Sequence, residues 1–320
     1  MSAPVGRRPT PRGRAGALAA AVILIVIFPV LAPNQFLVKL SALSGIAVLL
    51  ATGLNLIFGY AGQVSLGHAA FYGIGAYATA ILTTKAGWPS VAALIAGVAL
   101  AGIAAWLVGV PALRLKGHYL AMATLGFNEI VAIVLVQAKP LTNGTDGLGS
   151  IPPLSLGPLV IASNAANHYV VWACVLLGLW TARNLVAGRS GRSVRALHDS
   201  EVAAEASAVD TGRAKTSTFV ISALYAGLAG ALYAHFVSFI SPVDVVVAAS
   251  VTMVTMVVIG GMGTVLGPLL GGVLLTVGPE FLRSYQDYTL LAYGSLLIAV
   301  LIFWPQGLAG LVVRRKRGVG

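Results

Sequence analysis

Apolar runs separated by short polar or glycine-rich stretches make up nearly the whole chain of 320 residues. A helix needs about 20 apolar residues to cross the hydrocarbon core of a bilayer, with a range of about 17 to 25. The lengths of the runs therefore predict an all-α, polytopic membrane protein with about ten transmembrane helices. The ten predicted spans are residues 16–33, 36–58, 68–84, 88–110, 118–138, 168–187, 216–240, 245–260, 265–282 and 289–305.

Two of these assignments depend on how a run is interpreted. The first run follows a basic segment, as in a signal peptide, but no convincing cleavage site comes before the next run. We interpret it as a retained first span. The stretch 245–282 is too long for one crossing, and Gly260, Gly261 and Gly263 divide it near its middle. This stretch is therefore predicted to form two spans.

Residues 53–75 interrupt the apolar pattern most strongly, because six glycines and several polar side chains lie there between two apolar runs. Irregular backbone at membrane depth is tolerated only where protein or a water-filled cavity covers it. Gln63, Ser65 and His68 beside the glycines therefore favour a lined translocation path. Close packing of helices through glycine is the alternative, and the pattern leaves both interpretations open.

Asn128 and Glu129 lie near the middle of the fifth predicted span. A carboxylate at this depth costs roughly 2.5 to 3.5 kcal/mol on insertion scales, so such a group usually faces a bundle interior or water. We therefore add both residues to the predicted translocation path or its gate. The alternative is a neutral, hydrogen-bonded Glu129 that stabilises helix packing.

Composition supports the membrane assignment. The chain is 58% hydrophobic and only 9% charged, with a mean hydropathy of +0.91, whereas soluble domains carry roughly 25% charged residues. Nearly every residue lies in an apolar run, which leaves no room for a separate soluble domain. Cys174 is the single cysteine, so an internal disulfide and a cysteine metal cluster are both excluded.

The net charge of +11 is concentrated at the two ends, where four arginines precede the first apolar run and three arginines and a lysine follow the last. We divide the chain into a basic cytoplasmic N-terminus, 1–15, a single transmembrane domain, 16–306, and a basic cytoplasmic tail, 307–320. The charged loop 188–215 is predicted on the cytoplasmic side and the turn-rich loop 139–167 outside. With ten spans, 16 of the 20 Lys and Arg residues fall on the cytoplasmic side, in agreement with the positive-inside rule.

Ten spans also divide at the outer loop into two sets of five. Halves with an odd number of spans must be inverted relative to each other, an arrangement common in transporters. The short similarity between Gly62–Gly67 and Gly263–Gly267 is a weak sign of such a repeat. Small residues at every fourth position of the seventh span, such as Ala223, Gly227 and Ala231, predict close helix packing.

The loop 188–215 is predicted to form a pair of short amphipathic helices. Ser193 and Ser200 are possible caps, and Glu201 would be favourable in a first helical turn. Such a pair could dock on a cytoplasmic partner, although a solvated loop without a partner remains the alternative.

Motifs of catalysis are absent from the sequence. It contains no Gly-x4-Gly-Lys-Ser/Thr phosphate loop, and its five histidines show no metal-ligand spacing. No nucleophile–base or paired-carboxylate constellation is present either. We therefore expect a transport subunit with no metal site and no ATPase activity of its own.

Several segments taken together resemble the permease subunits of branched-chain amino acid ABC importers, in particular the LivM type. The resemblance covers roughly residues 40–310. The motifs that carry it are GLNLIFGYAGQVSLGHAAFYGIGAY, LKGHYLAMATLGFNEI, LTNGTDGL, GRSVRALHDSEVAAEA, FVISALYAGLAGALYAHF and VIGGMGTVLGPLLGG.

This resemblance implies partners that the pattern alone does not show. They are a second homologous permease subunit, two cytoplasmic ATPase subunits that bind ATP-Mg, and an extracytoplasmic substrate-binding protein. The resemblance also implies that the segment 192–208 docks on the ATPase. The coupling residues would be Arg192, Arg195, Asp199, Glu201 and Glu205. The family pattern has a glycine where this chain has Ala208, which predicts a different turn there.

Three other functions remain open from the sequence. A urea or short-amide permease of the same family is one, and a proton-coupled secondary transporter with Glu129 as its proton site is another. A receptor-like or purely structural membrane protein is the third. Uptake that needs ATP and a binding protein would indicate an ABC importer, and uptake that follows a proton gradient would indicate a secondary transporter. Binding without any uptake would indicate a receptor-like or structural protein.

Overall fold

The computed structural model describes residues 23, 25–115, 117–281, 294–295 and 307–310. Within them, five helices are long and apolar enough to cross a membrane. They are α2 (Gln35–Asn55) with its continuation η1 (Leu56–Tyr60), α4 (Ser90–Ala112), α5 (His118–Gln137), α7 (Asn164–Ala187) and α10 (Thr211–Val237). Three shorter helices match predicted spans: α3 (His68–Thr84), α11 (Val247–Gly260) and α12 (Gly267–Phe281).

The predicted division of residues 245–282 into two helices is confirmed. Gly261 and Gly263 both have positive φ angles, of 117° and 66°, and they separate α11 from α12. Glycine adopts such angles without a steric penalty, which is why the helix ends there. Predicted span ten lies outside the described residues except for 294–295, and span one is described mainly at 25–31, which are helical.

Two helices begin earlier than predicted because polar first turns precede their apolar parts. The backbone N–H of Ala166 donates to Ser163 Oγ at 3.1 Å and caps α7. The N–H of Arg213 donates to Asp210 Oδ1 at 2.9 Å and caps α10. These side chains satisfy N–H groups that have no partner within the helix.

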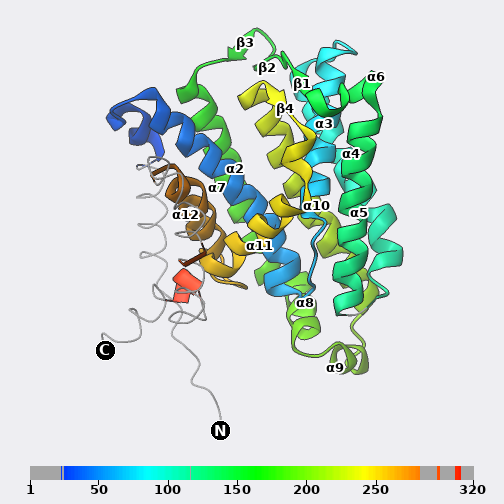
Figure 1. The fold of residues 1–320 in the computed structure, drawn as a ribbon. Coiled ribbons are helices and arrows are strands. Elements are labelled where there is room, and N and C mark those ends of the chain that lie inside the picture. Colours follow the sequence, from blue (N-terminus) through cyan, green and yellow to red (C-terminus); the bar gives the residue numbers. More distant parts are fainter. Residues whose placement is uncertain (1–22, 24, 116, 282–293, 296–306, 311–320) are drawn as a thin grey trace, which may run out of the picture.

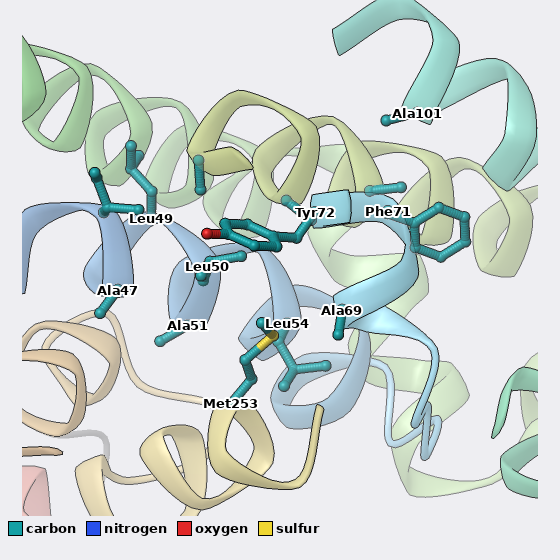
Figure 2. Close-up of a cluster of buried hydrophobic side chains, with 14 of the residues drawn as sticks. Ala47, Leu49, Leu50, Ala51, Leu54, Ala69, Phe71, Tyr72, Ala101 and Met253 are labelled. Atoms are coloured by element: carbon teal, nitrogen blue, oxygen red, sulfur yellow. The ribbon is translucent and has the colours of Figure 1, made fainter. Parts of the chain in front are cut away.

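Helix α2 runs through the centre of the molecule and packs against α7, α10, α11 and α12, of which α11 and α12 also pack against each other (Figure 1). In the most apolar 18-residue stretch of α2 and η1, 89% of the residues are buried. Figure 2 shows Leu50 and Leu54 of α2 packed near Tyr72 of α3 and Met253 of α11. The core is therefore formed by residues that are far apart in the sequence.

Helices α3, α4 and α10 pack tightly against one another. A Cβ atom added to Gly75 would collide with the backbone of Gly227, and one added to Gly230 would collide with the carbonyl oxygen of Tyr72. Small residues on α10 thus permit the close approach that the sequence predicts.

The connecting elements gather at opposite ends of the bundle (Figure 1). One end, called the strand end here, carries α6 (Lys139–Thr142), η2 (Gly144–Asp146), β1 (Leu148–Gly149), β2 (Leu154–Leu156), β3 (Leu159–Ile161), β4 (Phe239–Ile240) and η3 (Pro242–Val245). Strands β1 and β4 pair antiparallel, as do β2 and β3. The other end carries α8 (Arg189–Asp199) and α9 (Glu201–Ala206) and is called the coupling end. The loops predicted on opposite sides of the membrane therefore lie at opposite ends.

Candidate functional site

The first break in the helices follows α2. Residues 56–60 form the π-helix η1, residues 61–67 are irregular, and Gly62 has a φ angle of 67°. A Cβ atom on Gly59 would collide with the side chain of Asn55 and the backbone of Gly263. The glycine-rich stretch is therefore irregular and also closely packed, as expected for glycine-mediated contact, and its role in lining a path stays a prediction.

The second break, residues 261–266 between α11 and α12, is bound to the first by Asn55. The Asn55 Nδ2 group donates to the carbonyl oxygen of Thr264 at 2.8 Å. The N–H of Gly263 donates to Asn55 Oδ1 at 2.9 Å. Asn55 is only 2% exposed, so it satisfies two backbone groups that water reaches poorly.

A chain of buried polar contacts connects the first break to α5 and α11. The N–H of Leu66 donates to Thr124 Oγ1, and the N–H of Ala69 donates to Ser250 Oγ, both at 3.0 Å. Ser250 Oγ in turn donates to Asn128 Oδ1 at 3.4 Å. Asn128 therefore lies inside the bundle as part of a hydrogen-bonded network.

The five residues predicted to line a path do not share one environment. Ser65 and His68 are each 2% exposed, and Ser65 Oγ and His68 Nε2 have no hydrogen-bond partner among the described residues. Gln63 is half-buried and donates to the carbonyl oxygen of Ala61 at 3.3 Å. Glu129 is exposed, whereas the adjacent Asn128 is buried. The structure brings Ser65, His68 and Asn128 into the interior and leaves Glu129 outside it.

Replacing Ser65 with alanine tests its predicted role in the path. Because Ser65 Oγ makes no hydrogen bond within the described structure, its removal is expected to leave the thermal unfolding midpoint unchanged or slightly raised. A drop in the uptake rate at unchanged stability would indicate a role in transport. Unchanged uptake would remove Ser65 from the path.

The coupling end is formed by the two predicted short helices. Helix α8 buries Gly191, Val194 and Leu197 along one face. Ser200 caps α9 as predicted, because its side chain accepts from the N–H of Ala203 at 3.3 Å. The prediction for Ser193 is wrong, because α8 begins at Arg189 and Ser193 lies within it.

Helix α8 contacts the first break directly. A Cβ atom on Gly62 would approach the Nδ1 atom of His198 to 2.6 Å. Gly62 therefore permits both the left-handed backbone and the contact with α8. Through this contact, a displacement of α8 would act on the break.

Three of the five predicted coupling residues bind within their own chain. Arg195 Nη1 donates to the carbonyl oxygen of Val186 at 2.7 Å. Glu201 Oε1 lies 2.7 Å from Lys215 Nζ, and Glu205 Oε1 accepts from Thr211 Oγ1 at 3.0 Å. Each of these bonds fixes part of the α8–α9 segment to its surroundings.

Arg192 and Asp199, the other two predicted coupling residues, are exposed on α8. Val202 carries no signal in the sequence pattern, yet it is an apolar side chain 72% exposed on α9 and suited to contact with another protein. Lys215 is a second residue that the sequence did not single out, and its charged side chain is only 4% exposed. The position of Lys215 beside an apolar run was a sign in the sequence that its charge could be buried. The neighbouring residues do not indicate that Glu201 is its partner.

The turn after α9 is left-handed at Ala208, with a φ angle of 58°. Glycine adopts this conformation without strain. Ala208 adopts it too, although its Cβ atom makes the left-handed region unfavourable. We expect Ala208→Gly to stabilise the protein by up to about 1 kcal/mol, offset by the greater freedom of glycine in the unfolded chain. Thermal unfolding of the purified protein would measure this, and a lower midpoint would contradict it.

Comparison with known proteins places this geometry in a family. Residues 36–304 match the family described as "Branched-chain amino acid transport system / permease component". Over 317 residues the chain is 34% identical to the high-affinity branched-chain amino acid transport system permease protein LivM of Escherichia coli strain K12, covering 91% of this chain and 74% of that relative. It is 27% identical over 280 residues to the corresponding LivH protein of the same strain, covering 82% and 90%.

A further relative is the autoinducer 2 import system permease protein LsrC of Enterobacter sp. strain 638, which is 26% identical over 301 residues. No solved structure matches the chain. The family match extends from α2 beyond α12 and includes both breaks and the coupling end. The chain therefore belongs to the permease components of branched-chain amino acid transport systems.

Proposed function

We propose that this chain is the LivM-type permease subunit of an ATP-driven importer that carries branched-chain or related hydrophobic amino acids across the cytoplasmic membrane. The observation that carries the proposal is the 34% identity to LivM over 91% of the chain. The chain supplies a conduit and no catalysis, and ATP-Mg is bound and hydrolysed by partner ATPase subunits.

The proposed assembly contains a second homologous permease subunit, two cytoplasmic ATPase subunits and an extracytoplasmic binding protein. The proposed topology has ten spans in two inverted halves, with both termini and the coupling end in the cytoplasm. The two breaks, joined through Asn55, support this arrangement because each interrupts a helix in one half.

In the proposed mechanism, ATP binding closes the ATPase dimer and moves α8 and α9. The exposed Arg192, Asp199 and Val202 contact the ATPase, and the contact of His198 with Gly62 transmits the displacement to the first break. ATP can shift the permease only through its different affinity for the two conformations. The path residues are proposed to be Gln63, Ser65, His68, Asn128 and Glu129.

Uptake of radiolabelled leucine in cells that express the complete importer tests the proposal. Uptake is expected to stop when the ATPase subunits are inactivated and to persist when an ionophore dissipates the proton gradient. Uptake that follows the proton gradient instead would overturn the proposal. Strong competition by urea or short amides, but not by isoleucine or valine, would favour the amide permease.

A further inference from the structure

One face of α5 is exposed along the whole helix. It consists of positions three or four apart, and the residues on the opposite face, Leu120, Thr124, Asn128 and Leu135, are buried. We call the exposed face the α5 stripe. Its residues are the half-buried Gly126 and the exposed Tyr119, Met122, Glu129, Ile130, Ile133 and Gln137.

The α5 stripe is unsuited to contact with lipid because Glu129 lies at its middle. Helix α5 spans His118–Gln137, so this carboxylate stands close to the centre of a membrane-length helix. A charged side chain at that depth is costly and normally faces protein or a water-filled space. Among the described residues nothing covers Glu129, so its cover in the membrane comes from outside this part of the chain.

Gly126 gives a second indication, independent of charge. A Cβ atom at this position would meet nothing within 4 Å, so the chain itself has no need of a glycine there. Glycine in a helix interior costs about 1 kcal/mol relative to alanine. By contrast, Gly97, Gly102 and Gly109 of α4 each face close neighbours within the chain. Gly126 instead leaves room for another helix to approach from outside.

A groove with a volume of about 290 Å³ adjoins the stripe at the strand end. Its lining residues are Ala132, Ile133, Val136, Gln137, Thr145, Pro242, Val243 and Val246. The Asn128 side chain fixes α5 to this region by donating to the carbonyl oxygen of Val245 at 2.9 Å. The stripe and the groove therefore form one surface.

The exposed face of α4 shows what a lipid-facing surface of this protein looks like. Its exposed large side chains are all apolar and include no charge: Ile95, Leu100, Ile103, Trp106, Leu107 and Val110. The apolar parts of α4 and α5 are equally buried, at 28%, so the charge at mid-membrane distinguishes the α5 stripe from the exposed face of α4.

We infer that the α5 stripe and its groove form the contact face for the second permease subunit, with a helix of that subunit crossing at Gly126 and shielding Glu129 from lipid. This inference rests on the proposed function. A second copy of this chain fits less well, because a twofold axis near Gly126 would bring two Glu129 carboxylates together. LivM and LivH relatives are two different permease proteins that both resemble this chain, so a partner of the same family that differs from it is available.

Photocrosslinking in the intact importer tests the inference. A benzophenone-bearing amino acid is placed at Ile130, 61% exposed on α5, or at Ile103, 54% exposed on α4 as the matched control. We expect Ile130 alone to give a crosslinked product, and peptide mass spectrometry to identify the captured chain as the second permease. Capture of a second copy, of lipid only, or equal capture from both positions would overturn the inference.

The same preparation separates this inference from the proposed function. If the second permease and the ATPase co-purify with the chain but Ile130 does not crosslink to the permease, the inference fails and the proposed function stands. If neither co-purifies from cells that express the whole importer, the proposed function fails.

A second variant removes the space at Gly126. Gly126→Leu is expected to lower recovery of the second permease with the tagged chain by about tenfold, equivalent to about 1.4 kcal/mol. Leucine favours helix more than glycine does, so unfolding of α5 would not explain the loss. Ala99→Leu, at an exposed small residue of α4, is the control and should not change recovery. Equal recovery with Gly126→Leu would contradict the inference.

Discussion

Replacing Asn55 with leucine is expected to abolish measurable uptake and to lower the unfolding temperature of the importer strongly. The substitution leaves the carbonyl oxygen of Thr264 and the N–H of Gly263 without their partner in a buried site. Each buried backbone group left unpaired costs about 1 to 3 kcal/mol. It also removes the hydrogen bonds through which Asn55 joins the two breaks, so the breaks would no longer be held together.

Thr52→Val is the matched control for this experiment. Thr52 lies on α2 close to Asn55, is 3% exposed, and donates only within its own helix, to the carbonyl oxygen of Val48. Valine has nearly the same shape, so uptake should be retained. Gly59→Ala is a second variant that should break the same hydrogen bonds, because the added Cβ atom would displace the Asn55 side chain. Normal uptake in both Asn55→Leu and Gly59→Ala would show that this junction is dispensable.

The glycine pattern made both breaks predictable. Gly260, Gly261 and Gly263 divide an apolar run that is too long for one span, and Gly59, Gly62 and Gly67 stand beside polar residues within another. Such signals are local, because a residue without a Cβ changes the backbone at its own position. The contacts between the two breaks could not be predicted in this way. Asn55 and Thr264 are 209 residues apart, and no local pattern connects them.

The placement of Glu129 illustrates a second limit. The cost of a carboxylate in the membrane indicates that it must be shielded, but the sequence does not say by what. The direction of the side chain depends on how α5 packs, and the neighbouring Asn128 points into the bundle while Glu129 is exposed. The first residues of α7 and α10 were not predicted for a similar reason. The polar turns capped by Ser163 and Asp210 resemble loop in the sequence, and only their hydrogen bonds show that the helices begin there.

The contacts at the coupling end give a physical route from α8 to both breaks. His198 of α8 touches Gly62 in the first break, and the break is joined to the second through Asn55. Helix α9 is held separately, through the ion pair of Glu201 with Lys215 on α10. In the proposed mechanism, a displacement of α8 and α9 would therefore reach the centre of the bundle by two sets of contacts, one through the break and one through α10.

Breaking the ion pair between Glu201 and Lys215 is expected to loosen α9 on α10, leaving the bond of Glu205 with Thr211, and to uncouple ATP hydrolysis from uptake. The side chain of Lys215 is 4% exposed and that of Glu201 is 23% exposed. Removing one member of a buried pair typically costs about 3 to 5 kcal/mol, because the other charge is left uncompensated. Glu201→Ala should therefore be the more damaging change, since the ammonium that it strands is the more deeply buried. Lys215→Met strands the carboxylate, which water reaches more easily.

The double variant Glu201→Ala/Lys215→Met decides whether the charges themselves matter. With both charges absent neither member of the pair is stranded by loss of the other, so the unfolding midpoint should recover most of what Glu201→Ala loses. Arg213→Ala is the control, because the pair of Arg213 with Asp210 is 91% and 57% exposed and such surface pairs contribute about 0 to 1 kcal/mol. Measurement of unfolding and of leucine transported per ATP hydrolysed completes the test. If the double variant is as unstable as Glu201→Ala, the lesion lies in lost contacts of Glu201 and not in the stranded ammonium.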